Sequence, residues 1–215
     1  MISGSNLGHM AVWNLEEKRL VSQIREAHSG SVDGMHSLQL EPLMVTSSND
    51  NSIKIWIFDM SDGSARLLRQ RHGHSLPPVK IRFHDPIGQD ILSAGLDSCL
   101  MSFSTDHDRK NKSLGRASFN KAETKRSGLK LDQFMMPPIV DFASNDVKQC
   151  DWDSIVCVHD NLRMVTTWDF IKSTMGKHKI DHSRFKENER LYGSVVATVS
   201  FFNYTIHYPS VIILF

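Results

Sequence analysis

The segment Leu43–Asp59 is the strongest constraint on what this chain can fold into. Residues 43–47 are β-rich, residues 48–51 have the composition of a turn, and residues 53–57 are β-branched and aromatic. This pattern predicts a strand, a tight turn and a second strand. Trp56 lies six residues after Asp50, a spacing that is typical of the end of a WD repeat. Recurrence at a fixed period would distinguish such a repeat from a chance hairpin.

The segment recurs on both sides. Trp13 lies 43 residues before Trp56, and Asp97 lies 47 residues after Asp50. In the downstream copy Phe103 takes the place of the tryptophan. Phenylalanine keeps the packing surface but has no indole N–H to donate, so we expect this copy to lack one hydrogen bond of its neighbour.

Two further marks keep the same period. His28 and His74 lie 46 residues apart, and each begins the stretch that leads to the next Asp and aromatic residue. A looser copy has its turn at Asp160-Asn161 and ends at Trp168-Asp169. A period of about 40–45 residues with these marks is typical of four-stranded propeller blades. The sequence therefore predicts an all-β, incomplete WD-repeat β-propeller of about three to four blades with antiparallel sheets.

The expected organisation follows from the repeat marks and the segments between them. We expect no strand before the one that ends at Trp13, no strand within 105–135, and a charged loop at 172–188. The last residues lack the turn Asp and the terminal Trp, as a premature stop in unspliced sequence would produce. The ranges are the end of a truncated blade at 1–26, WD-repeat blades at 27–71 and 72–104, a basic insertion loop at 105–135, a divergent blade at 136–177, a loop and the start of a further blade at 178–200, and an atypical apolar tail at 201–215.

Composition limits the class of protein but does not identify a partner. The 215 residues carry a formal net charge of +1 and are 40% hydrophobic. Three cysteines without a C-x-x-C pair favour reduced thiols in an intracellular protein over a disulfide framework or a zinc site. We expect no secretory signal, cofactor, metal or catalytic residue, because the chain has no nucleophile motif, P-loop or metal-binding cluster.

The polar marks of the repeat predict a hydrogen-bond network inside each blade. A buried imidazole, carboxylate and indole N–H must each find a partner, because an unpaired group costs a few kcal/mol. A His, a Ser and an Asp in one unit could also suggest a catalytic triad. Recurrence once per blade, without a nucleophile turn, favours the structural role. The expected members are His28, Thr46 or Ser48, Asp50 and Trp56 in one blade, and His74 and Asp97 in the next.

Residues 109–130 hold eight Lys or Arg side chains against one Glu. Flexible cations with little apolar mass are suited to contacts with a phosphate backbone. A phosphoprotein contact, a solvated insertion and a nuclear-import signal around residues 125–126 are alternatives. The candidate RNA-contact residues are Arg109, Lys110, Lys112, Arg116, Lys121, Lys125, Arg126 and Lys130.

Several segments extend the likeness beyond the repeat marks. EPLMVTSSNDNSIKIWIFD, RLLRQRHGHSLPP, ILSAGLDSCLMSFST and CDWDSIVCVH resemble the family of U3 small nucleolar RNA-associated tandem-propeller proteins. The resemblance runs from residue 3 to about residue 199. It implies a non-enzymatic scaffold of the small-subunit processome in the nucleus and nucleolus, acting in pre-rRNA processing to 18S rRNA.

The resemblance also implies partners. These are other WD-repeat proteins of the UtpB subcomplex and U3 snoRNA or pre-rRNA, with direct RNA contact left open. We expect no small-molecule substrate and no membrane contact. The alternative is a generic WD-repeat adaptor that binds peptides in a ubiquitin ligase or chromatin complex. Such an adaptor has no need of the basic insertion, so that segment discriminates between the two functions.

Overall fold

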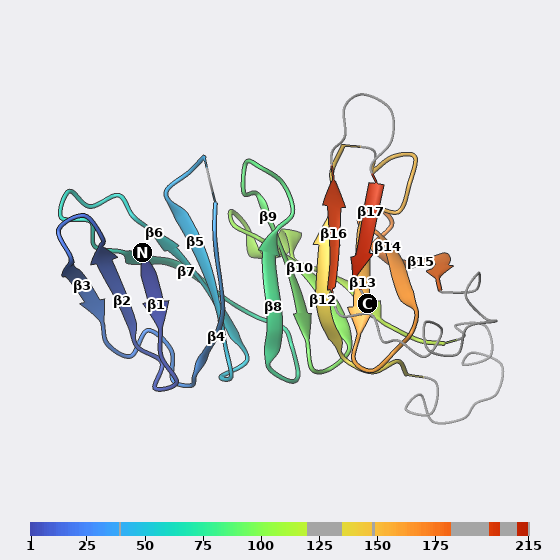
Figure 1. Cartoon of the computed structure of the whole chain (residues 1–215), viewed down its shortest axis with the longest axis horizontal. Coiled ribbons are helices and arrows are strands. Elements are labelled where there is room, and N and C mark those ends of the chain that lie inside the picture. Colours follow the sequence, from blue (N-terminus) through green and yellow to red (C-terminus); the bar gives the residue numbers. More distant parts are fainter. Residues whose placement is uncertain (39, 120–134, 148, 182–197, 203–209, 215) are drawn as a thin grey trace. The chain divides into compact units, whose positions relative to one another are not determined.

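The computed structural model describes residues 1–38, 40–119, 135–147, 149–181, 198–202 and 210–214. Over these residues the chain is almost entirely β-structure, which confirms the predicted fold class (Figure 1). The chain divides into two compact units. The first comprises residues 1–97 and 101–111, and the second comprises residues 98–100 and 112–215.

The first sheet of the first unit has three strands in the order β1-β2-β3. Strand β1 pairs antiparallel with β2, with Ile2 opposite Val12. The expectation that no strand precedes the one ending at Trp13 is therefore wrong. All three residues of β1 pair with residues of β2, so this short segment forms a strand although three residues are too few to show a pattern in the sequence. The strands are β1 (Ile2–Gly4), β2 (Met10–Asn14) and β3 (Arg19–Ile24).

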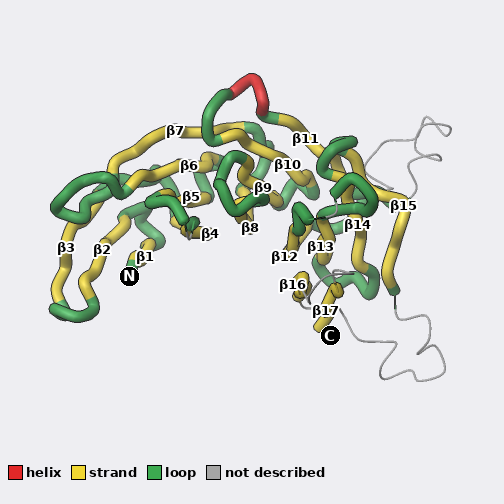
Figure 2. The backbone as a smooth tube through the Cα atoms, turned by 90° about the horizontal axis from the view of Figure 1, so that it is seen from above, coloured by secondary structure: helices red, strands yellow, loops and turns green. Residues whose placement is uncertain are grey.

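The second sheet contains the segment Leu43–Asp59, and its four strands follow one another in chain order. The predicted strands and the turn between them are confirmed, with Met44 opposite Trp56. Strands β5 and β6 are largely buried, whereas β7 is mostly exposed at the outer edge (Figure 2). The bounds are β4 (Val32–Ser37), β5 (Leu43–Ser48), β6 (Ser52–Ile57) and β7 (Arg66–His72).

The third sheet has the order β11-β10-β9-β8. The prediction that residues 105–135 contain no strand is wrong, because β11 lies within that range. Leu114 is its single fully buried side chain, so the strand leaves almost no periodic signal in the sequence. The elements are β8 (Pro78–Phe83), β9 (Asp90–Gly95), β10 (Cys99–Ser104), the 3₁₀ helix η1 (Asp108–Lys110) and β11 (Lys112–Arg116).

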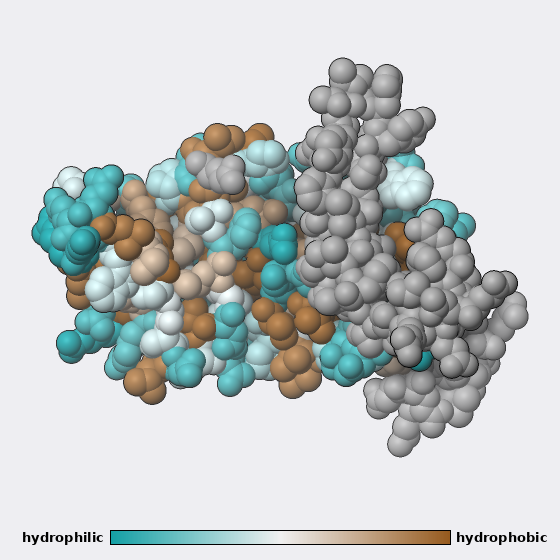
Figure 3. Space-filling model, viewed as in Figure 1, coloured by the Kyte–Doolittle hydropathy of each residue, from teal (hydrophilic) through white to brown (hydrophobic). Residues whose placement is uncertain are grey.

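Two apolar clusters hold the first unit together. The first joins β5 and β6 to β8, β9 and β10, and its buried members include Val45, Ile55, Ile81 and Phe103. The second gathers Met10, Ala27, Met44 and Trp56 between the first two sheets. Full burial of such a side chain is worth about 1.5–3 kcal/mol, so face-to-face packing of sheets is the main stabilising term. The surface over this unit mixes polar and apolar patches (Figure 3).

The second unit contains a four-stranded sheet in chain order and a two-stranded sheet. The prediction of a charged loop at 172–188 is wrong for its first part, because β15 lies there. Met175 and Ile180 pair with residues of β14, and the remaining side chains are mostly exposed. The strands are β12 (Ile139–Ser144), β13 (Ile155–His159), β14 (Val165–Asp169), β15 (Thr174–Ile180), β16 (Thr198–Phe202) and β17 (Ser210–Leu214).

A buried arginine fastens β7 to the end of β10 within the first unit. Arg71 is 4% exposed, and its Nε and Nη2 donate to the Ser104 carbonyl oxygen at 3.0 and 2.9 Å. Its Nη1 also forms an ion pair with Asp108. One guanidinium thus joins an outer strand of the second sheet to the loop that leads into η1.

Replacing Arg71 with methionine should destabilise the fold. The Ser104 carbonyl would lose two hydrogen bonds from a charged donor, for which we expect a loss of about 1.5–3 kcal/mol in the free energy of unfolding. Urea denaturation of Arg71→Met and of the control Arg69→Met, an exposed neighbour on the same strand, would measure it. Equal midpoints for the two variants would show that the guanidinium contributes no stability.

Candidate functional site

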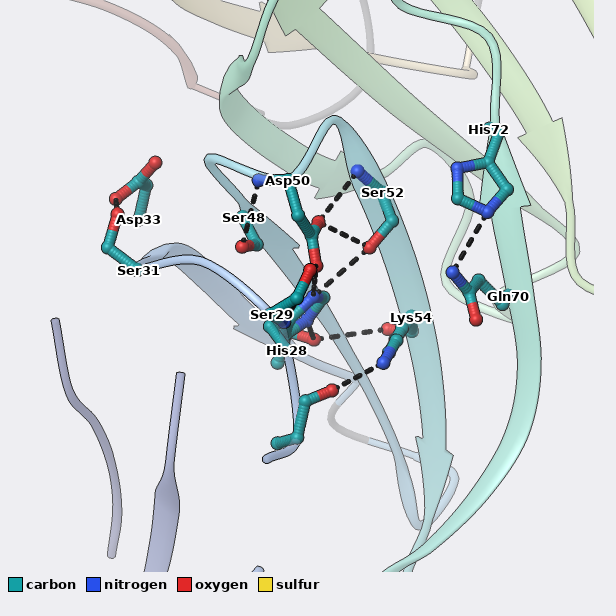
Figure 4. Close-up of polar contacts among 12 residues, drawn as sticks. His28, Ser29, Ser31, Asp33, Ser48, Asp50, Ser52, Lys54, Gln70 and His72 are labelled. Atoms are coloured by element: carbon teal, nitrogen blue, oxygen red, sulfur yellow. Dashed lines mark hydrogen bonds and ion pairs between the residues drawn. The ribbon is translucent and has the colours of Figure 1, made fainter. Parts of the chain in front are cut away.

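The most polar buried region of the first unit lies around His28, which precedes β4. Its Nε2 is 2.7 Å from Thr46 Oγ1, and its Nδ1 is 3.2 Å from Asp50 Oδ2 and 3.1 Å from Ser52 Oγ (Figure 4). Trp56 Nε1 donates to the same Thr46 hydroxyl at 2.9 Å. The loop before β4, strand β5, the following turn and strand β6 each contribute one or more of these groups.

The donors and acceptors of this network fix its protonation. The indole of Trp56 can only donate, so Thr46 Oγ1 accepts from it, and the same hydroxyl lies within hydrogen-bond distance of His28 Nε2 and, at 3.4 Å, of the Lys54 carbonyl oxygen. The carboxylate of Asp50 can only accept, so a neutral His28 carries its proton on Nδ1, and its Nε2 is then an acceptor for the Thr46 hydroxyl. Burial lowers the pKa of His28 and outweighs the opposing field of Asp50. His28 is therefore neutral near pH 7.

Asp50 closes the network at the β5–β6 turn. Ser52 donates to its Oδ1 through Oγ at 2.6 Å and through the backbone N–H at 2.9 Å, and the Ser29 N–H donates to Oδ2 at 3.1 Å. Burial acts to raise the pKa of Asp50, but these hydrogen bonds, joined at acid pH by the charge of a protonated His28, hold it well below its usual value. Ser48, the second predicted strand hydroxyl, instead accepts from the Asp50 N–H at 3.2 Å.

The third sheet repeats the network with one member fewer. His74 Nδ1 lies 3.1 Å from Asp97 Oδ1, and its Nε2 lies 2.9 Å from Ser93 Oγ. Phe103 lies where the indole would be, with its ring 6.1 Å from that of His74. Packing is thus kept, but no donor reaches Ser93 from the aromatic side.

The fourth sheet builds a related network from Trp168, which the repeat marks indicated, and from Thr166 and His159, which they did not. Trp168 Nε1 donates to Thr166 Oγ1 at 3.1 Å, and this hydroxyl lies 2.9 Å from His159 Nε2. His159 Nδ1 lies 2.9 Å from the Pro137 carbonyl oxygen, which takes the place of the carboxylate. Thr166 precedes Trp168 by two residues, so both lie on one face of β14. The sequence signal for this network was a Thr two residues before a Trp, together with a His at the end of the preceding strand.

The hydrogen bonds of these networks indicate a structural role in the core of each sheet. Each imidazole, hydroxyl and carboxylate described above is bonded to another member of its own network, and the imidazoles are buried. A cavity of about 600 Å³ adjoins His28 and Asp50, with Glu26, Lys54 and Gln70 in its lining. Lys54 Nζ is held by the Ala27 carbonyl at 2.6 Å (Figure 4). Among the described residues, no group of three or more His, Cys, Asp or Glu side chains could hold a metal ion.

The candidate RNA-contact residues fall into three groups. Arg109 and Lys110 are exposed at the end of η1. Lys112 Nζ donates to the Phe170 carbonyl at 3.1 Å and lies 3.8 Å from the centroid of that ring, while Arg116 Nε donates to Cys99 Sγ at 3.3 Å. The remaining four, Lys121, Lys125, Arg126 and Lys130, lie outside the described residues.

The sheets, their turn marks and their buried networks define a WD-repeat β-propeller segment. A family model described as the WDR36/Utp21 second beta-propeller domain matches residues 79–206, and the chain belongs to this family. This confirms the family resemblance read from the sequence. Within the described residues, no helix is both long and apolar enough to span a membrane.

Curated relatives share the likeness over most of the chain. Human WD repeat-containing protein 36 is 43% identical over 190 residues, which are 88% of this chain and 21% of the relative. The U3 small nucleolar RNA-associated protein 21 homolog of Schizosaccharomyces pombe is 30% identical over 183 residues, 85% of this chain and 20% of the relative. U3 small nucleolar RNA-associated protein 21 of Saccharomyces cerevisiae is 30% identical over 190 residues, with 83% and 20% covered. The chain thus spans about a fifth of the length of these relatives.

The networks of the second and third sheets predict different costs for removing the central hydroxyl. Thr46→Val leaves both the Trp56 N–H and His28 Nε2 without their partner, so we expect a loss of about 2–4 kcal/mol in the free energy of unfolding. Ser93→Ala leaves only His74 Nε2 unpaired and should cost about half as much. Urea denaturation followed by circular dichroism would measure both. Equal costs would contradict the role given to the indole donor.

Stability should also fall as the solution becomes acidic. Burial lowers the pKa of His28, His36 and His159, so the unfolded chain binds more protons than the folded one once the pH drops below about 6.5. The contribution of Asp50, whose pKa is lowered, is present above about pH 3.8 and lost below it. Urea midpoints at pH 7.5 and 5.5 should therefore differ, with the lower value at pH 5.5.

Matched histidine variants would test the assignment. His159→Gln should flatten the dependence of the midpoint on pH, because it removes one buried titrating group. His107→Gln, at an exposed position, should leave the dependence unchanged. A pH-independent midpoint for the unsubstituted chain would contradict the burial argument.

Proposed function

We propose that this chain is part of a non-enzymatic WD-repeat scaffold of the U3 snoRNP and small-subunit processome, acting in pre-rRNA processing to 18S rRNA. The observation that carries the proposal is the match to the WDR36/Utp21 propeller family, two of whose relatives are named for association with U3 small nucleolar RNA. Such a role implies the nucleus and nucleolus as its location. The proposed protein partners are other WD-repeat proteins of the UtpB subcomplex.

The chemistry of the blades supports a scaffold over an enzyme. The His, Asp, Ser and Thr side chains of the types that a hydrolase uses bond to one another inside the sheets. What the sheets expose are outer strands such as β7, turns and connecting segments. These are surfaces on which other proteins and RNA can bind without any bond being made or broken. The names of the relatives favour this scaffold over a generic peptide-binding adaptor.

RNA contact is proposed for the basic segment at 109–130. Of the residues with described side chains, Arg109 and Lys110 offer exposed cations, whereas Lys112 and Arg116 bind other groups of the second unit. An RNA test should therefore leave Lys112 and Arg116 in place, because their replacement would perturb packing as well as charge. The useful substitutions are at residues 109, 110, 121, 125, 126 and 130.

A pull-down from nuclear extract would test the proposal. Tagged chain should enrich U3 RNA over an unrelated small nuclear RNA, and enrichment should fall as salt rises. Replacing the six residues with Gln should weaken association and flatten the salt slope, by about 0.7 for each phosphate of a single strand that is no longer neutralised.

Two comparisons separate the outcomes. Arg25→Gln with Arg69→Gln removes two exposed cations elsewhere and should leave U3 enrichment unchanged, whereas Arg109→Gln with Lys110→Gln should reduce it. An unchanged slope in the six-residue variant would remove the basic segment from the proposal. A folded, unsubstituted chain that enriches no U3 RNA would overturn the processome role.

A further inference from the structure

A second cavity, of about 350 Å³, lies within the second unit. The segment before β13, the end of β14 and the strand β15 surround it. Its lining includes Asp151, Trp152, Asp153, Asp169, Lys172 and His178. We refer to it as the Trp152 pocket. None of these residues belongs to the hydrogen-bonded network of Trp168, Thr166 and His159, although Asp153 accepts from Thr167 of β14 and Asp169 accepts from the Lys172 backbone N–H.

The aromatic wall of the Trp152 pocket is unusually open. Trp152 is 54% exposed, although an indole ordinarily gains much from burial. Its ring lies parallel to the imidazole of His178, with an interplanar angle of 3° and 5.8 Å between centroids. This stacking orients the indole and leaves a large part of its surface uncovered. An exposed π-face attracts cations, and among protein side chains the guanidinium of arginine is the commonest partner.

The fold holds one carboxylate of the pocket in a fixed place. Asp153 Oδ2 lies 2.5 Å from Thr167 Oγ1 of β14. On the other side, a Cβ atom added to Gly176 would collide with the same oxygen. Only a glycine at this point of β15 allows the carboxylate to approach the backbone so closely. Asp153 is therefore positioned by two strands.

The charges of the lining favour a cation over an anion. Lys172 Nζ donates to Asp169 Oδ2 at 2.6 Å, and that hydrogen bond is the main reason why the pKa of Lys172 is raised. This pairing neutralises Asp169. The field of Asp153 contributes to raising the pKa of Lys172 as well, and the lining as a whole has three carboxylates against two ammonium groups, those of Lys172 and Lys177. A phosphate entering here would meet carboxylates, whereas a cation would find complementary charge.

We propose that the Trp152 pocket binds an arginine side chain of a partner protein. The planar guanidinium stacks on the exposed indole of Trp152, and its N–H groups donate to the carboxylate of Asp153, with Asp151 adding to the negative field. Lysine has the charge but not the plane or the paired donors, so arginine fits this combination better. The inference holds whether or not the basic segment contacts RNA, and it gives the proposed scaffold a partner of stated chemistry.

The test uses the full chain and a defined probe. An arginine pentapeptide, acetyl-Gly-Gly-Arg-Gly-Gly-amide, is titrated while NMR follows the indole N–H signals. Trp152 is identified as the signal absent from Trp152→Leu. We expect the arginine peptide to shift this signal and to bind about tenfold more tightly than the citrulline peptide, which keeps the shape but not the charge.

Variants locate the binding. Trp152→Leu and Asp153→Asn should each weaken binding of the arginine peptide about fivefold or more. Trp13→Leu, an exposed indole of the first unit, should leave it unchanged. Since Trp152 is largely exposed, its replacement should not unfold the sheet, and circular dichroism would verify this.

Three results would overturn the proposal. They are equal binding of the arginine and citrulline peptides, a Trp152 signal that neither peptide shifts, and binding unaffected by Trp152→Leu. A single-stranded oligouridine that shifts the Trp152 signal where the arginine peptide does not would assign the pocket to a nucleobase instead.

Discussion

The buried indole N–H of Trp56 is the constraint on which the second sheet depends. Left without an acceptor, such a group costs on the order of 1–3 kcal/mol, which is a large share of the stability of a small domain. The hydroxyl of Thr46 accepts it and also bonds to His28 Nε2, while the carboxylate of Asp50, which can only accept, places the proton of His28 on Nδ1. The network thereby ties two strands, a turn and the loop that enters the sheet into a single arrangement.

Comparison of the sheets shows which part of this arrangement is required. In the third sheet the indole is absent and the remaining bonds persist. In the fourth sheet the indole is present, the histidine lies at the end of strand β13 and not in the loop that enters the sheet, and a backbone carbonyl replaces the carboxylate. The common element is a Ser or Thr hydroxyl bonded to Nε2 of a buried imidazole. The fold therefore requires that buried polar groups be satisfied, and it accepts several sets of residues that do so.

The number of buried side chains in a strand explains which strands the sequence could predict. Strands β5, β6, β8, β9 and β10 were predictable because they alternate or carry apolar runs between turn residues, and Asp50 and Asp97 marked their turns. Strands β11 and β15 were missed because outer strands need few buried side chains. Leu114 in one, and Met175 and Ile180 in the other, are too few to form a pattern. The His159 network was missed because its spacing does not repeat.

The hydrogen bonds within each sheet determine which side chains of the chain are open to a binding partner. The histidines and aspartates that recur once per blade bond within their own sheets, so the side chains open to a partner are other residues of the blades and of the segments between them. Two such regions carry opposite charge. The basic segment at 109–130 suits phosphate, whereas the Trp152 pocket has an excess of carboxylate beside an open indole. Because a surface suited to one of these ligands repels the other, a scaffold that bears both can bind RNA and a basic protein without competition between them.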